Sequence, residues 1–170
     1  MNDLAEGGIY AIESSYLERY VQLGIASGRV VSVSFPDHPA ETAQLLERDS
    51  VGDPDDETPD HPVIDRLFEY LDGVSEVSFT DIEIALTVPT VERAVLEQVR
   101  TIPYGESVDV KTIVSMTPEL DDDEQSAAIQ VRTALDENPI PIVIPDHRVR
   151  DGPSAAPPAV EQKLRSLEGL

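Results

Sequence analysis

An acid, a base and a cation occupy consecutive positions near the end of the chain. The run IPDHRV, residues 144–149, contains Asp146, His147 and Arg148 directly after a proline. A carboxylate can attack carbon to form an ester, and a histidine can serve as a general acid or base. The same residues also suit a structural role, in which Asp146 is paired or hydrogen-bonded with His147 or Arg148. The sequence therefore predicts either a reactive site or a structural charge network here.

The rest of the composition limits what that site can do. The chain contains no cysteine, which excludes thiolate nucleophiles, disulfides and zinc sites built from cysteine. The acidic run at residues 53–57 lacks the glycine and the distal glutamate of a calcium loop, and the acids at 121–124 suit the start of a helix. We expect no metal and no cofactor.

The first half of the chain reads as a small sheet with helices. We expect strands at residues 8–15, 20–26, 29–35 and 78–86, the second and third forming a hairpin that turns at Ser27-Gly28. Hydrophobic spacing predicts helices over residues 38–48 and 63–73, with Gly73 as a C-cap. The acidic, proline-rich segment 49–62 reads as a loop.

The second half changes character at about residue 87. We expect one helix in each of the four segments TVERAVLEQVRTI, VDVKTIVSM, DDDEQSAAIQVRTALDENP and AVEQKLRSLEG. The middle two should form a helix-turn-helix. The extended apolar run PIPIVI, residues 139–144, should deliver Asp146 at the end of a strand. The fold class is thus α+β, with a β-rich domain over residues 1–86 and a helical domain over 87–170.

Charge is the outlier of the composition. Twelve basic residues face 34 acidic ones, giving a net charge of −22, and only Lys111 and Lys163 are lysines. Such an excess strains a compact fold by self-repulsion, which salt near 1 M screens because the Debye length falls to about 3 Å. The composition indicates a salt-loaded cytoplasm; the alternative is an ordinary acidic protein. No signal peptide and no apolar run of about 18 residues is present, so we expect a cytosolic protein with no membrane contact.

The order of motifs in the second half resembles a known family. VLEQVRTIPYGES, a helix-turn-helix, ENPIPIVIPDHRV and a last helix ending in LEG together resemble the alkylguanine-DNA alkyltransferases. These proteins repair DNA by moving an alkyl group from guanine onto their own cysteine, in a Pro-Cys-His-Arg motif. The resemblance implies their two-domain fold and double-stranded DNA as a partner.

The resemblance also assigns a candidate catalytic set. Asp146 stands at the position of the acceptor cysteine, while His147 and Glu168 match the histidine that deprotonates the thiol through water and the glutamate behind it. Asn138 matches the asparagine hinge between the recognition helix and the active-site strand. From the residues alone, Glu168 also reads as a solvated residue of the last helix, and Asn138 as a cap that fixes the turn before Pro139.

A candidate DNA-binding set follows in the same way. Val110 matches the helix-turn-helix tyrosine that helps to rotate the lesion's phosphate, and Ile129 matches the arginine that fills the gap left by the flipped base. Arg132 lies about one turn further along the same helix, and Arg148 matches the motif arginine. An apolar side chain such as Ile129 can also occupy a vacated base stack.

Three functions remain open on the sequence. The leading one is non-catalytic DNA binding or alkyl-lesion sensing in DNA repair, with plain or alkylated duplex and a repair protein as partners. The second is an interaction module of the same fold that has abandoned DNA. In the third, Asp146 accepts the methyl group as an ester that water activated by His147 hydrolyses.

Overall fold

The chain folds as an α+β protein, as predicted from the sequence. The computed structural model describes residues 8–47, 61–73 and 75–170. Two compact units divide the chain, Met1–Ala85 with a four-stranded sheet and Leu86–Leu170 with most of the helices. Within the described residues, no helix is long and apolar enough to cross a membrane.

The sheet of the first unit has the strand order β3-β2-β1-β4. Strand β2 (Arg19–Ala26) lies antiparallel to both β1 (Gly8–Ser14) and β3 (Arg29–Ser34), while β4 (Gln44–Leu46) is parallel to β1. The predicted β2–β3 hairpin is confirmed. Its two turn residues have positive φ angles, 53° at Ser27 and 77° at Gly28, as a tight two-residue hairpin requires.

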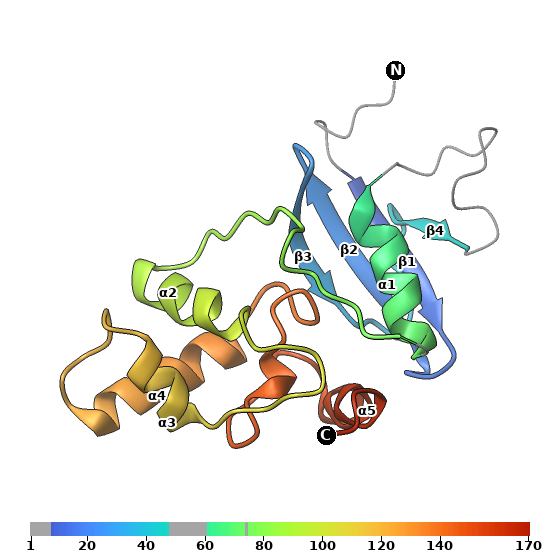
Figure 1. The fold of residues 1–170 in the computed structure, drawn as a ribbon. Helices are drawn as coiled ribbons and strands as arrows, with labels where there is room; N and C mark the ends of the chain where they lie inside the picture. The colour runs from blue at the N-terminus through green and yellow to red at the C-terminus, as the bar shows by residue number, and fades with distance from the viewer. Residues whose placement is uncertain (1–7, 48–60, 74) are drawn as a thin grey trace. The chain divides into compact units, whose positions relative to one another are not determined.

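Helix α1 (Pro62–Asp72) confirms the second predicted helix and lies along one face of the sheet (Figure 1). It buries Val63, Ile64, Leu67 and Tyr70. The His61 ring caps the helix, because Nδ1 accepts from the Val63 amide at 3.1 Å while Nε2 lies 2.8 Å from the Gly28 carbonyl oxygen. The C-cap is Gly73, at φ 71°, as predicted.

Two predictions in this unit were wrong. Of the helix predicted at 38–48, residues 38–47 are described and do not form a helix; they contain β4, whose three residues pair with Tyr10–Ile12 and bury Leu46. A strand of three residues is too short for hydrophobic spacing to reveal. Residues 78–86 are irregular and join the sheet through one bridge, between Val30 and Ile84. The loop predicted at 49–62 lies, up to residue 60, outside the described residues.

The second unit contains the four predicted helices. They are α2 (Thr90–Val99), α3 (Val110–Met116), α4 (Glu124–Asp136) and α5 (Pro158–Leu167) (Figure 1). Carboxylates cap the middle two, since Asp109 accepts from the Thr112 amide at 2.8 Å and Asp123 from the Ser126 amide at 2.9 Å. The acids before α4 therefore have a structural use at the helix start.

The segment that leads to Asp146 runs through the core of this unit. Ile140, Ile142, Val143 and Ile144 are each at most 2% exposed, and the 3-10 helix η3 (Asp146–Arg148) follows. Asp146, His147 and Arg148 are themselves buried in this core.

Candidate functional site

A tight turn, rather than a strand, delivers Asp146. The predicted extended run was wrong: the Ile144 amide donates to the Ile140 carbonyl at 2.8 Å, and Ile142 adopts a φ of 76°. Three prolines in residues 139–145 remove backbone donors that a strand would need. A β-branched residue in the left-handed region costs on the order of 1–3 kcal/mol, so the surroundings must hold this turn in place.

The Asn138 side chain holds the turn. Its amide nitrogen donates to the Ile144 carbonyl and to Asp146 Oδ2, both at 3.0 Å, and its oxygen accepts from the Ile140 amide at 3.0 Å. Asn138 is 3% exposed and follows the C-cap of α4, Glu137. It therefore ties the end of α4 to the segment that carries Asp146.

The Asp146 carboxylate is fully enclosed. Its exposed fraction is 0%, and besides Asn138 it accepts from the Ser154 hydroxyl at 2.5 Å and from the Ala155 amide at 2.9 Å. Burial raises the pKa of Asp146, and the hydrogen bonds from Ser154, Ala155 and Asn138 offset only part of that rise. The carboxylate is thus an acceptor for three internal donors and is closed to an electrophile from outside.

His147 and Glu168 lie in direct contact, although 21 positions separate them. The ring Nε2 of His147 lies 2.6 Å from Glu168 Oε2, and both side chains are 0% exposed. Glu168 is the C-cap of α5, so the last helix positions it. The sequence reading of Glu168 as a solvated residue was wrong.

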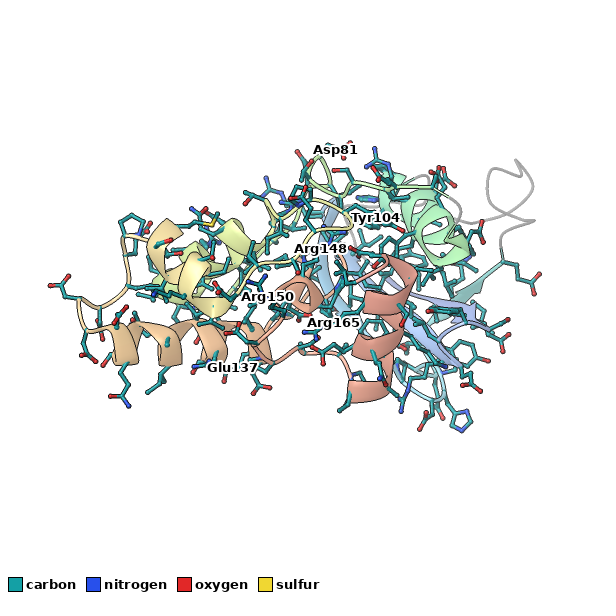
Figure 2. All side chains as sticks on the ribbon, turned by 60° about the horizontal axis from the view of Figure 1, so that its bottom comes forward. Asp81, Tyr104, Glu137, Arg148, Arg150 and Arg165 are labelled. Carbon is teal, nitrogen blue, oxygen red and sulfur yellow. The ribbon has the colours of Figure 1, made fainter. Side chains whose placement is uncertain are left out.

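Arg148 also points inward, toward the same glutamate. Nε donates to Glu168 Oε1 at 2.7 Å, Nη2 to Oε2 at 3.1 Å and Nη1 to the Ile102 carbonyl at 2.6 Å. Its guanidinium lies 5.7 Å from the centre of the Tyr104 ring (Figure 2). The Arg148 side chain is only 8% exposed and belongs to the buried network around Glu168, and its role in DNA binding stays a prediction.

Glu168 is the anion at the centre of this network. Burial alone would raise the pKa of Glu168, but hydrogen bonds from His147 and Arg148, together with their charges, lower it to about 2. The Gly105 amide also donates to Oε1 at 3.1 Å. Glu168 therefore stays ionised at neutral pH and joins α5, η3 and the Tyr104–Gly105 turn.

The sequence reasoning missed two residues of the site. Ser154 lies in a loop rich in proline and alanine, where nothing in the sequence indicates a partner for Asp146. Arg165 on α5 donates to the carbonyls of His147 at 2.9 Å and Val149 at 3.1 Å. Its spacing of four from Glu161, which it contacts at 3.2 Å, predicts only a surface pair.

The remaining predicted DNA-binding residues lie on α3 and α4. Val110 is buried, at 2% exposure, whereas Ile129 is 59% exposed and Arg132 is exposed. Helix α4 buries its other face through Ala127, Val131, Ala134 and Leu135. Ile129 is thus a large apolar side chain outside the packed stripe of its helix.

A comparison with known protein families finds a match within the second unit. Residues 90–167 match the family model described as the DNA-binding domain of 6-O-methylguanine DNA methyltransferase. The second unit is therefore similar in sequence to the DNA-binding domain of these methyltransferases. No curated protein matches the sequence.

Several solved structures share the fold over nearly the whole chain. The O6-methylguanine methyltransferase of Mycobacterium tuberculosis is 23% identical, covers 94% of this chain and 90% of its own, and has a TM-score of 0.61. The same organism's OGT in complex with DNA is 21% identical, with a TM-score of 0.64 and coverages of 94% and 89%. The enzyme of Pyrococcus kodakaraensis is 18% identical, with a TM-score of 0.52 and coverages of 95% and 98%.

Proposed function

We propose that this protein is a member of the alkylguanine-DNA alkyltransferase superfamily and that it binds double-stranded DNA in the cytoplasm, as part of alkyl-damage repair, without accepting the alkyl group itself. The proposal rests mainly on the burial of Asp146 and on the hydrogen bonds that its carboxylate accepts. By the resemblance of PDHR to the family's Pro-Cys-His-Arg motif, Asp146 stands at the acceptor position, and its carboxylate is enclosed by three donors.

The chemistry at this position supports a non-catalytic role. A carboxylate is a weaker nucleophile toward saturated carbon than a thiolate, and the chain has no cysteine elsewhere to replace it. The lone pairs of Asp146 already accept from Asn138, Ser154 and Ala155. An attack on an alkyl group would first have to break these contacts and open the site.

The DNA surface of the proposal is α4, the second helix of the helix-turn-helix formed with α3. Support comes from the match to a domain described as DNA-binding and from the relative solved in complex with DNA. On α4, the exposed Ile129 is suited to wedge into the base stack, and Arg132 is suited to contact a phosphate.

Binding on this surface cannot rest on charge alone. If four cations touched phosphates, raising salt from about 0.1 to about 3 M would cost roughly five decades of affinity, because the logarithmic slope is about 3.6. A chain with two lysines and a net charge of −22 must use apolar and backbone contacts as well. These contacts resist salt better, and Ile129 supplies one.

A titration of two matched duplexes tests the proposal. One duplex carries a single O6-methylguanine, the other plain guanine at that position, and fluorescence anisotropy follows binding from about 0.2 to about 3 M KCl. We expect saturable binding of both duplexes, and a lesion sensor additionally prefers the alkylated one. If neither duplex binds at any salt concentration, the proposal fails and an interaction module of the same fold takes its place.

A further inference from the structure

A concavity of about 360 Å³ lies between α3 and α4 of the second unit. Its lining includes two cationic side chains, Lys111 and Arg132, and two carboxylates, Glu124 and Asp151. Arg132 belongs to the DNA surface proposed above, so the concavity adjoins that surface. Of these four residues, Asp151 comes from neither helix; it lies in the loop that follows η3.

Hydrogen bonds of its own side chain and of the preceding backbone fix Asp151 at the concavity. Its Oδ1 accepts from the Val110 amide at 2.7 Å. The residues before it pair with the chain just before α3, since the Val108 amide donates to the Arg148 carbonyl and the Arg150 amide to the Val108 carbonyl, both at 2.9 Å. The carboxylate is therefore a fixed part of the lining, although the residue is exposed.

The loop on the other side of Asp151 is also anchored. Ser154 and Ala155, three and four positions later, donate to the buried Asp146 carboxylate at 2.5 and 2.9 Å. The residue at the former acceptor position thus helps to keep the Asp151 loop in place. The two carboxylates lie on one continuous segment, one inside the protein and one at its surface.

We propose that Asp151 is a tethered anion that competes with the DNA backbone for this concavity. A phosphate group that approaches Lys111 and Arg132 meets a carboxylate already among them, and the like charges repel. The inference rests on the DNA binding proposed above, and it identifies Asp151 as a residue that weakens this binding. Because a Coulomb interaction is screened by salt, the effect of Asp151 is large in dilute buffer and small at molar salt.

The substitution Asp151→Asn tests this inference with little change in shape. Asparagine keeps an oxygen that can accept from the Val110 amide, so only the charge is removed. For the plain duplex we expect about fivefold to tenfold tighter binding than wild type at about 0.2 M KCl, and less than about twofold at 2 M. Glu97→Gln is the matched control, because Glu97 is an exposed carboxylate of α2 that does not line the concavity.

The outcomes separate the inference from the proposed function. If wild type binds DNA and Asp151→Asn binds equally at both salt concentrations, the inference is overturned and DNA binding stands. An equal gain in Glu97→Gln assigns the effect to net charge and also overturns it. If neither wild type nor Asp151→Asn binds, both proposals fail. Should melting show that Asp151→Asn is unfolded, Asp151→Ser, whose hydroxyl oxygen can also accept, is judged by the same criteria.

Discussion

At the scale of single residues, the site consists of buried charged side chains that hydrogen-bond to other groups inside the protein. Asp146 accepts from three neutral donors, whereas Glu168 lies between His147 and Arg148. Burial raises the pKa of both acids, but only Glu168 has cationic partners that reverse the shift: the pKa of Asp146 is raised, and that of Glu168 is lowered to about 2. This contrast makes both acids testable through stability.

Glu168→Gln should destabilise the second unit strongly. The substitution keeps the size of the side chain but leaves Arg148 buried without its anion, and breaking a buried ion pair in this way costs about 3–5 kcal/mol. Urea unfolding of the two proteins at neutral pH measures the difference. Glu161→Gln is the control, because it breaks a partly exposed pair with Arg165, which is worth about 0–1 kcal/mol. Equal losses in the two variants would contradict the central role given to Glu168.

Asp146→Asn should gain stability relative to wild type as the pH rises from about 4. Since the folded-state pKa of Asp146 lies above its unfolded value, ionisation opposes folding, and its contribution to stability falls as pH rises through the folded pKa. Glu168 has the opposite sign and loses stability as pH falls from about 4.5 to about 2, but this loss is common to both proteins. Urea unfolding across pH measures the difference, and a wild type that gains on the variant with rising pH would show the assignment to be wrong.

At the scale of elements, the five α-helices were predictable, although a sixth was wrongly expected where β4 lies, and the approach to the site was not predictable. Hydrophobic spacing indicated α1, α2, α4 and α5, because their apolar faces repeat over ten residues or more, and Gly73 marked the end of α1. The turn before Asp146 contains only apolar residues and prolines, so periodicity could not separate a strand from a buried turn. Its conformation depends on Asn138, whose three hydrogen bonds all reach beyond adjacent residues.

Some contacts of the site were likewise predictable from the sequence, and others were not. The resemblance brought together His147 and Glu168, which lie 2.6 Å apart in the structure. It gave no indication that Arg148 faces inward or that Ser154 and Ala155 close over Asp146. Those contacts depend on how the loop between η3 and α5 folds, and no local sequence pattern encodes that.

Two residues of helix α4, Ile129 and Arg132, should determine how the protein recognises DNA. Ile129→Asp should remove any preference for the alkylated over the plain duplex, because a charged side chain cannot replace an apolar wedge in the base stack. Arg132→Ala should weaken both duplexes alike and lower the logarithmic salt slope by about one unit. The anisotropy titration measures both effects, with Arg29→Ala on β3 as the control. An Ile129→Asp variant that keeps the wild-type preference would place recognition elsewhere.

At the scale of the whole molecule, net charge dominates. A charge of −22 on 170 residues makes the folded state repel itself in dilute buffer, and salt relieves that repulsion. We therefore expect the melting temperature to rise from dilute buffer to about 2 M KCl. Sucrose at matched osmolarity controls for effects of solute exclusion, since it does not screen charge. A melting temperature that stays flat or falls with KCl would remove the argument for a salt-rich cytoplasm.

One labelling experiment distinguishes DNA binding by this protein from alkyl transfer to it. A duplex carrying a radiolabelled methyl group on guanine is incubated with the protein in molar KCl and separated by gel filtration, first natively and then after denaturation. We expect the label to elute with the protein in the native run and to return entirely to the DNA in the denatured one. Label that stays on the protein after denaturation, or is released from the DNA as a small molecule, would contradict the claim that Asp146 accepts no alkyl group. Label that never elutes with the protein would contradict DNA binding.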